Sequence, residues 1–512
     1  MQRTRVFPSV SQAGVCLHIT SLPGDYGIGE IGREAFRFLD LMAEAGLRVW
    51  QVLPVGPTAY GDSPYQSLSS FAANELLLGT AELIELGLLS ADEAVPLTRL
   101  SRHKVDYGAV VSFKWELLNL AAGRFQDRAT SEMKSRFDEF QARNHGWLDH
   151  YAVYRIVKRH RNEQSWNIWP GEFGSPDSPG VRKLAGSRRD EIMAIKVLQF
   201  LFDLQWQQLR KHAKDRGILL FGDIPIYLPL DCADVWQDKR LVELNETGQP
   251  ASVAGVPPDF FSENGQLWGN PLYDWQYHES TGFDWWIARL ANAIHRHDLV
   301  RIDHFRGLES YWSVPATAHT AAGGEWLPGP RDAFLSRVYD ALPGAALVAE
   351  DLGFESPDVD ALRDRYNIPG MKVLQNELSL GPFDPGSVPA HSVCYTGTHD
   401  NDTITSWFKG SPQDTRSPEE ILDQQAQLLR LTGGSYRTIH TDLIRLMFST
   451  AARLAIIPMQ DYLGLGNEAR LNFPGTSSGN WAWRLVHDEL SRETIDTIGE
   501  LVEDAGRRAQ SR

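Results

Sequence analysis

The amino-acid sequence predicts an α/β fold: a (β/α)8 TIM barrel with a large helical insertion, an active-site loop insertion and no C-terminal β-domain. Two observations support this prediction. Short apolar runs of strand length alternate with longer helical patterns along the 512 residues. Acidic residues stand at the carboxyl ends of three such runs, where barrel enzymes carry their chemistry. The alternative is a doubly wound sheet. It would carry a glycine-rich phosphate turn directly after an early strand, and we expect no such turn.

Eight apolar runs fit the strands of a barrel. Each is short, rich in branched apolar residues and bounded by polar or turn-forming residues, as strands buried on both faces are. The predicted strands are 15–19, 49–54, 218–224, 299–303, 346–350, 371–375, 392–396 and 454–458.

Two connections are too long for ordinary links and predict insertions over the active face of the barrel. The first, about 65–210 between strands two and three, is largely helical, with apolar residues at helical spacing in 110–121 and again in 189–215. The second, about 228–290 between strands three and four, is rich in glycine, proline and aromatic residues. A polar helix over about 491–508 ends the chain. We therefore expect residues 1–512 to form a single catalytic domain with two inserted subdomains.

Composition narrows the range of partners. A net charge of −16 argues against nucleic acid and disfavours a polyanionic substrate, but it does not oppose a neutral polymer. The 16 tryptophans and 15 tyrosines slightly favour carbohydrate, because sugar rings stack on flat aromatic faces, although large enzymes bury many aromatics in any case.

Compartment and cofactors follow from what the sequence does not contain. No apolar run is long enough to cross a membrane, and residues 1–8 lack the apolar core of a signal peptide. The cysteines Cys16, Cys232 and Cys394 are scattered and form no disulfide framework. We therefore expect a cytoplasmic protein with no membrane partner. No spacing of His, Asp or Glu indicates a zinc or calcium site, so we expect no metal and no cofactor.

The most informative stretch is Arg301-Ile302-Asp303. On a strand, the two charged side chains project from the same face, and a fixed arginine keeps a neighbouring carboxylate ionised. An ionised aspartate can attack a sugar carbon or stabilise an oxocarbenium ion. Taken alone, an Arg-x-Asp pair is most often a surface ion pair. Glu350 and Asp400, each near the end of a further predicted strand, favour a catalytic group of three carboxylates.

Nine motifs, in family order, resemble glycoside hydrolase family 77, the 4-α-glucanotransferases of the amylomaltase or disproportionating type. The resemblance covers nearly the whole chain. The Arg-x-Asp, Glu and His-Asp elements alone would fit any enzyme resembling α-amylases, whereas the motifs at 61–66 and 266–271 narrow the likeness to transferases. The motifs are GPTAYGDSPYQ at 56–66, GDIPIY at 222–227, DCADVW at 231–236, GVPPDFFS at 255–262, QLWGNP at 266–271, RIDHFRG at 301–307, AEDLG at 349–353, GTHDNDT at 397–403 and GNWAWR at 479–484.

The resemblance implies roles for individual residues. Asp303 would be the nucleophile, Glu350 the general acid/base and Asp400 the transition-state stabiliser. The segment 255–262 would be a mobile loop over the cleft. Further residues would bind sugar: Arg301 and His399 in the cleaved-bond subsite, Tyr60 stacked near that sugar, Asp223 lining the same cleft, and Gln266, Trp268 and Asn472 around the scissile bond. Ser63, Pro258 and Asp259 would also bind the substrate.

The resemblance also implies a reaction. A retaining double displacement would move segments of α-1,4-glucan to a glucose or maltooligosaccharide acceptor, without cofactor or metal. An α-glucan hydrolase of the amylase type is the alternative, because the same three carboxylates serve both reactions. A catalytically silent glucan-binding protein is a further alternative, which the intact triad disfavours. Ala59, Ala73, Glu75 and Asn376 depart from the family pattern and leave the preferred chain length open.

Overall fold

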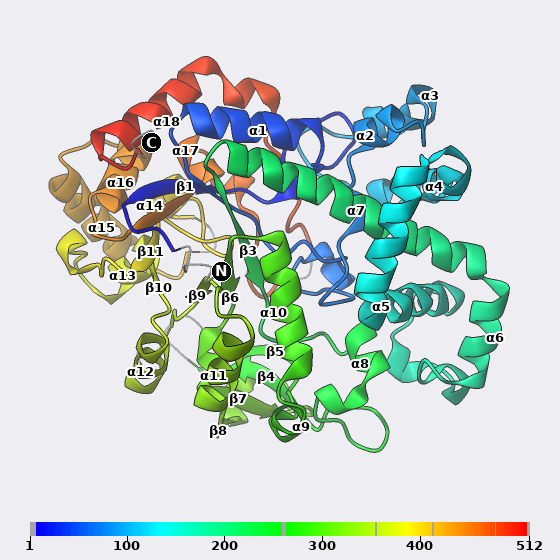
Figure 1. Ribbon diagram of the computed structural model, residues 1–512. Helices are drawn as coiled ribbons and strands as arrows, with labels where there is room; N and C mark the ends of the chain where they lie inside the picture. The colour runs from blue at the N-terminus through cyan, green and yellow to red at the C-terminus, as the bar shows by residue number, and fades with distance from the viewer. Residues whose placement is uncertain (1–6, 259–262, 354–355, 412–413, 477, 509–512) are drawn as a thin grey trace.

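The protein is built around an eight-stranded parallel sheet that curls into a barrel (Figure 1). The computed structural model describes residues 7–258, 263–353, 356–411, 414–476 and 478–508. The sheet has the order β10-β11-β12-β1-β2-β3-β6-β9. The N–H of Ala349 in β9 donates to the carbonyl of Pro369, just before β10, at 2.9 Å, so the two ends of the sheet nearly close. The strands are β1 (Gln12–Cys16), β2 (Val49–Gln51), β3 (Leu219–Ile224), β6 (Leu299–Ile302), β9 (Leu347–Ala349), β10 (Gly370–Val373), β11 (Ser392–Tyr395) and β12 (Leu454–Pro458).

These are the eight predicted strands, so the predicted barrel is confirmed. The bounds differ at some ends. β1 begins at Gln12 and ends at Cys16, because the apolar residues that follow leave the sheet for the short helix η1 (Ile19–Ser21). β10 ends at Val373, because helix α13 (Leu374–Leu380) starts immediately. A continuous apolar run does not distinguish a strand from the buried turn that follows it.

One expectation about the sequence was wrong. The run Gly27-Ile28-Gly29-Glu30-Ile31-Gly32 does have the spacing of a dinucleotide-binding turn. It does not follow a strand directly, because β1 ends at Cys16 and η1 intervenes. The backbone of Gly29 packs against the carbonyl of Ile19, so the glycine serves a close approach of two chain segments. The barrel topology excludes the doubly wound sheet.

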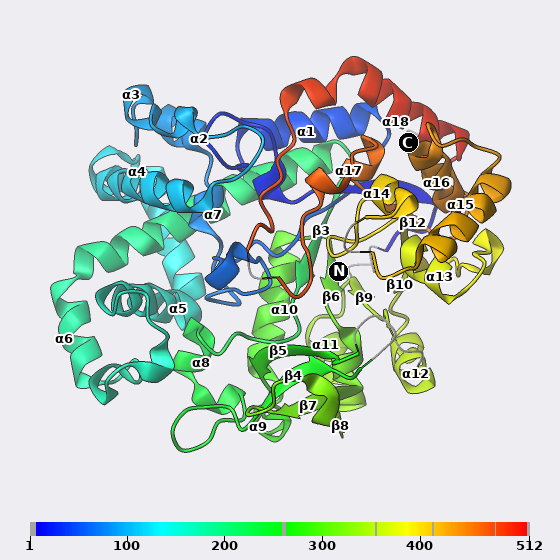
Figure 2. The same cartoon turned by 180° about the vertical axis from the view of Figure 1, so that it is seen from behind.

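Helices surround the barrel, and the first and last of them, α1 and α18, lie side by side in both views (Figures 1 and 2). Gly14 shows how tightly the strands pack, since a Cβ there would lie 2.5 Å from both Ile456 Cδ1 and the carbonyl oxygen of Val49. Besides α13, the helices outside the inserted segments are α1 (Arg33–Glu44), α10 (Asp284–Arg296), α11 (Arg331–Ala341), α12 (Pro357–Arg365), α14 (Ile404–Lys409), α15 (Pro418–Thr432), α16 (Ile439–Phe448), α17 (Met459–Tyr462) and α18 (Arg492–Asp504).

The segment between β2 and β3 is largely helical and stands on one flank of the barrel (Figure 1). Its two predicted helices are present, one buried along the spacing predicted for 110–121 and the other with the predicted bounds of 189–215. The longest helix, α5, was not predicted, because its polar residues show no clear apolar stripe. The helices are α2 (Thr80–Glu85), α3 (Ala91–Ala94), α4 (Tyr107–Arg128), α5 (Ser131–His160), α6 (Pro179–Ser187) and α7 (Arg189–Asp215).

A second, antiparallel sheet with the order β5-β4-β7-β8 lies beside the barrel (Figure 2). Its first two strands, β4 (Ser252–Val256) and β5 (Gln266–Pro271), belong to the predicted loop insertion, together with α8 (Ala233–Gln237) and α9 (Trp275–Ser280). The other two, β7 (Ser310–Pro315) and β8 (Glu325–Pro328), come from the connection after β6. Two separate connections therefore build one sheet next to the strand ends. No helix in the described part of the chain is long and apolar enough to cross a membrane.

Candidate active site

The carboxyl ends of adjacent barrel strands bring two of the predicted carboxylates together. Asp303 directly follows β6, and Glu350 directly follows β9. These strands pair in parallel, and the N–H of Glu350 donates to the carbonyl of Ile302 at 3.0 Å. Asp400 lies in the loop after β11, on the same side of the barrel. The three carboxylates thus occupy the end of the barrel where such enzymes carry their sites.

Arg301 connects Asp303 to a second aspartate. Its Nη1 atom lies 2.8 Å from Asp303 Oδ1 and 2.9 and 2.7 Å from the two oxygens of Asp223 on the neighbouring strand β3. Burial opposes a charged Arg301, but Asp223 and Asp303 outweigh it and raise its pKa well above the usual value. The Asp223 side chain is 1% exposed and that of Asp303 is 29% exposed, so Asp303 is the carboxylate that a substrate can reach.

Tyr65 links Asp223 to His399. Its hydroxyl donates to Asp223 Oδ2 at 2.7 Å and lies 3.2 Å from His399 Nδ1, and the two rings stack at 4.7 Å. Desolvation raises the pKa of Tyr65 well above its ordinary value, and Asp223 adds to the effect. The hydroxyl therefore keeps its proton. Because that single proton points at Asp223, the contact with His399 requires Nδ1 to be the donor.

Asp400 is held as a carboxylate. Asn472 Nδ2 donates to its Oδ1 at 2.6 Å, and His399 Nε2 lies 3.4 Å from its Oδ2. Desolvation would raise the pKa of Asp400, but His399 and the amide of Asn472 outweigh it and keep that pKa well below the ordinary value. Arg470 donates to the Asp400 carbonyl at 2.6 Å and so fixes the backbone of the same residue.

Glu350 differs from Asp400 in that its pKa is raised. Burial is the main cause that raises its pKa, to about 7. The charge of Arg301 lowers this pKa, and the charge of Asp303 raises it. Oε2 accepts the N–H of His304 at 2.6 Å and Oε1 accepts that of Leu352 at 3.1 Å. A carboxyl that still carries a proton near neutral pH, beside a partly exposed aspartate, is the pairing that acid-assisted glycoside cleavage requires.

Strand β5 of the second sheet contacts the chain segment that follows Asp303. The ring of Trp268 contacts His304, the residue after Asp303, edge-on at 4.8 Å and 87°. Gln266 is exposed on the same strand, and its Oε1 accepts from Trp268 Nε1 at 3.1 Å. Trp268 therefore contacts the residue that follows the nucleophile candidate, and Gln266 contacts Trp268.

The remaining predicted residues lie farther from these contacts or outside the described part of the chain. Ser63 is in the turn before Tyr65, where its Oγ accepts the Tyr65 N–H at 3.3 Å. Pro258 is half-buried two residues after β4. Tyr60 begins the short helix η2 (Tyr60–Asp62), but its side chain is outside the described structure. Asp259 and the second half of the predicted mobile loop 255–262, residues 259–262, are also outside the described residues.

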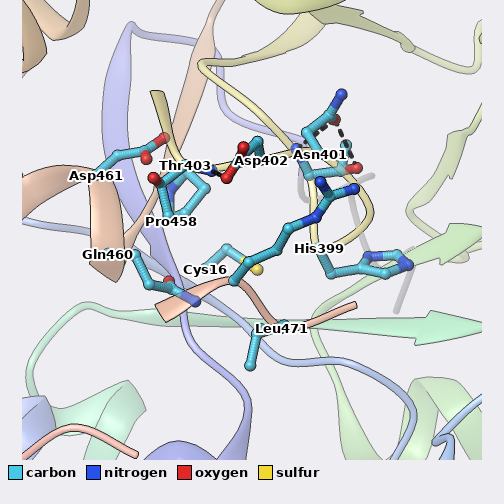
Figure 3. Close-up of a pocket in the computed structure, with 11 residues that line it drawn as sticks. Cys16, His399, Asn401, Asp402, Thr403, Pro458, Gln460, Asp461 and Leu471 are labelled. Carbon is cyan, nitrogen blue, oxygen red and sulfur yellow. Dashed lines mark hydrogen bonds between the residues drawn. The ribbon is translucent and has the colours of Figure 1, made fainter. Parts of the chain in front are cut away.

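Two cavities adjoin the site. A cavity of about 220 Å³ extends from Asp400 past Asn376 to Arg416. A smaller cavity of about 20 Å³, enough for roughly one water molecule, lies behind His399 (Figure 3). Asp461 lines the smaller cavity and accepts from Thr396 Oγ1 at 2.5 Å.

Sequence reasoning missed Tyr65, Arg470 and His304 as parts of the site. Tyr65 and His304 lie inside quoted motifs, and their residue types could have marked them as candidates. Arg470 gave no signal, because only the folded loop after β12 brings it to Asp400. Within the described ranges, no three His, Cys, Asp or Glu side chains are grouped so as to hold a metal ion.

Comparison with known proteins agrees with this geometry. The model of a family described as 4-alpha-glucanotransferase, glycoside hydrolase family 77, matches residues 17–489. A 4-alpha-glucanotransferase of Thermus thermophilus is 43% identical over 488 residues, 94% of this chain and 96% of the relative. One of Synechocystis is 42% identical over 97% of this chain and 98% of the relative. The solved amylomaltase of Streptococcus agalactiae in complex with acarbose has a TM-score of 0.90 and 31% identity, covering 97% of this chain and 99% of that one. The chain therefore belongs to glycoside hydrolase family 77, the 4-alpha-glucanotransferases.

Proposed function

We propose that this enzyme moves segments of α-1,4-glucan to a glucose or maltooligosaccharide acceptor by a retaining double displacement, with Asp303 as the nucleophile. The single observation that carries the proposal is the contact of Arg301 with two aspartates, of which one is buried and the other partly exposed. The guanidinium stabilises negative charge on Asp303, and Asp223 holds the guanidinium in place.

In the first step, Asp303 attacks the anomeric carbon of the donor glucan. The glycosidic C–O bond breaks, and Glu350 gives its proton to the departing oxygen, which leaves as the 4-hydroxyl of the released segment. A pKa of about 7 keeps Glu350 protonated for this step in mildly acidic to neutral solution. The sugar remains attached to Asp303 through an ester bond.

In the second step, the acceptor replaces the released segment. Glu350, now ionised, takes the proton from the 4-hydroxyl of glucose or a maltooligosaccharide, and that oxygen attacks the anomeric carbon. The bond to Asp303 breaks and the α-configuration is restored by the second inversion. Free carboxylate Asp303 and protonated Glu350 are both regenerated, so no cofactor or metal enters the cycle.

The other site residues bind the reacting sugar. Asp400, held ionised by His399 and Asn472, accepts hydrogen bonds from ring hydroxyls and stabilises positive charge on the flattening sugar. Additional glucose units occupy the cleft past Gln266 and Trp268 and, on the other side, the cavity next to Asn376.

Transfer, as opposed to hydrolysis, requires that sugar reach the ester before water does. The helical insertion on one flank of the barrel and the second sheet next to the strand ends would limit the access of water to the site (Figures 1 and 2). The α-glucan hydrolase alternative needs an open, wet site with the same carboxylates. We place the enzyme in the cytoplasm, where its three unpaired cysteines would stay reduced.

Incubation with pure maltotriose tests the proposal. Disproportionation releases glucose and builds longer maltooligosaccharides while the number of reducing ends stays constant, because each broken bond is remade. A steady rise in reducing ends at the rate of glucose release would make the enzyme a hydrolase. The Asp303→Asn variant is the control and should be slower by orders of magnitude. Glu350→Ala with an activated donor and azide should give an α-glycosyl azide, and a β-product would contradict double displacement.

A further inference from the structure

His304, the residue after Asp303, has a left-handed backbone. Its φ and ψ are 48° and 52°, a region that residues with a Cβ occupy at a cost, although histidine and asparagine do so more readily than most. It precedes the short helix η8 (Phe305–Leu308), and its carbonyl accepts from the N–H of Gly307 at 2.9 Å. Such strain persists only where the surroundings maintain it, and it clusters at functional sites.

The left-handed turn directs two successive N–H groups at one residue. The N–H of His304 donates to Glu350 Oε2 at 2.6 Å, and that of Phe305 donates to the Glu350 carbonyl at 2.9 Å. From the other side, the N–H of Leu352 donates to Oε1 at 3.1 Å. Both carboxyl oxygens of Glu350 are therefore held by backbone donors, and one of these donors depends on the conformation of His304.

The imidazole ring of His304 contributes no charge to this arrangement. Burial lowers its pKa to about 4, so the ring is neutral at pH 7. It packs edge-on against Trp268, and its Nε2 atom is buried without a hydrogen-bond partner among the described residues. The charged groups that face Glu350 are Arg301 and Asp303. The influence of His304 on Glu350 therefore passes through its backbone.

We propose that His304 is a positioning residue for the general acid/base. Its left-handed turn joins the chain segment of Asp303 to the carboxyl of Glu350 and fixes the distance and orientation of the two reacting groups. This inference rests on the role proposed above for Glu350. It also assigns a purpose to a strained residue that does not itself transfer a proton.

The hydrogen bond has a predictable electrostatic effect. A backbone N–H stabilises an ionised carboxylate more than a protonated carboxyl, so it lowers the pKa of its acceptor. When the turn relaxes and the N–H moves away, the pKa of Glu350 rises and the carboxyl gains freedom to rotate. The first effect moves the alkaline limb of the activity profile to higher pH, and the second lowers kcat.

Two pairs of variants separate the backbone from the ring. His304→Gly and His304→Ala both lack the ring, but only glycine enters the left-handed region without cost. His304→Asn and His304→Val both carry a smaller side chain, and asparagine tolerates this region whereas the β-branched valine does not. For each variant, kcat and KM on maltotriose, the pH dependence of kcat/KM and the melting temperature are measured on the full-length enzyme.

We expect kcat of the alanine variant to be about tenfold below that of the glycine variant, with similar KM, and its alkaline limb to lie at higher pH. Asparagine should likewise exceed valine. Equal kcat and equal alkaline limbs in the glycine and alanine variants would overturn the inference, even if the valine variant fails to fold. Glycine and asparagine variants as impaired as valine would also overturn it, because the ring itself would then be what matters. An active Glu350→Gln variant would instead refute the proposed function, so the two failures are distinguishable.

Discussion

Arg301 Nη1 lies 2.8 Å from Asp303 Oδ1, and the same nitrogen contacts both oxygens of Asp223. The sequence predicted that Arg301 and Asp303 lie close together, since residues two apart on a strand face the same way. The pairing partner on β3 was not anticipated. Asp223 faces Arg301 because β3 and β6 are in register at these two residues. Asp223 therefore holds the Arg301 guanidinium in place, and the guanidinium stabilises the negative charge of Asp303.

Removing this cation should destabilise the fold as well as stop the reaction. Arg301→Ala leaves the buried carboxylate of Asp223 without a counter-charge, which should cost about 3–5 kcal/mol of unfolding free energy. Urea denaturation measures the loss. The double variant Arg301→Ala/Asp223→Asn should recover part of it, because the uncompensated charge is gone. A double variant no more stable than the single one would show that the ion pair is not the source of the loss.

Replacing Tyr65 by Phe should affect turnover more than stability. The change removes the hydroxyl between Asp223 and His399 and leaves the stacked ring in place. We expect kcat/KM to fall by roughly tenfold or more, since Asp223 and His399 lose the hydroxyl that contacts both of them, and the free energy of unfolding to fall by about 1 kcal/mol. Tyr277→Phe is the matched control. The Tyr277 hydroxyl also donates to a carboxylate, that of Asp238, but both residues belong to the insertion between β3 and β6 and contact none of the three candidate catalytic carboxylates. An equal loss of activity in the control would contradict the assignment.

The pH profile should report Glu350 on its alkaline side. The residue must be protonated to act as an acid, and burial raises its pKa to about 7. Activity kcat/KM on maltotriose should therefore fall tenfold per pH unit above about pH 7. With an activated glycosyl donor, whose leaving group needs no proton, Glu350→Ala should retain its glycosylation rate across the same range. A wild-type profile flat to pH 9 would remove Glu350 from the role of acid.

Asp461 should make stability depend on pH. It is fully buried, and burial raises its pKa to about 7. In the unfolded chain it ionises near pH 4, so between about pH 4 and 7 the folded protein holds a proton that the unfolded chain has lost. Stability therefore falls as pH rises through this window, by about 1.4 kcal/mol per unit at most.

The comparison with Asp461→Asn isolates this effect from other titrating groups. The difference in unfolding free energy, wild type minus variant, should be largest near pH 4 and should decline toward pH 7, after which it stays constant. Denaturant melts at several pH values measure it. A difference independent of pH would mean that Asp461 titrates alike in both states.

The barrel was predictable because its strands are buried on both faces and read as continuous apolar runs. The second sheet was not, because its strands β5 and β8 are largely exposed and carry Gly, Pro and Trp without alternation. Asp303 and Glu350 could be found as charged residues ending apolar runs. Arg470 could not be found in that way, since its contact with Asp400 joins two loops and leaves no pattern in either.

The pairing of β1 with β12 has a consequence for biosynthesis. The first strand leaves the ribosome with one neighbour, β2, close behind it, but its other neighbour is made only when residues 454–458 emerge. Until then β1 and β11 both present open edges, which invite pairing with other chains. Asn472, the amide donor to Asp400, is made later still. A nascent chain is therefore both inactive and vulnerable to aggregation until residues 454–472 have been translated, and a nonsense mutation before residue 454 would leave it permanently in that state.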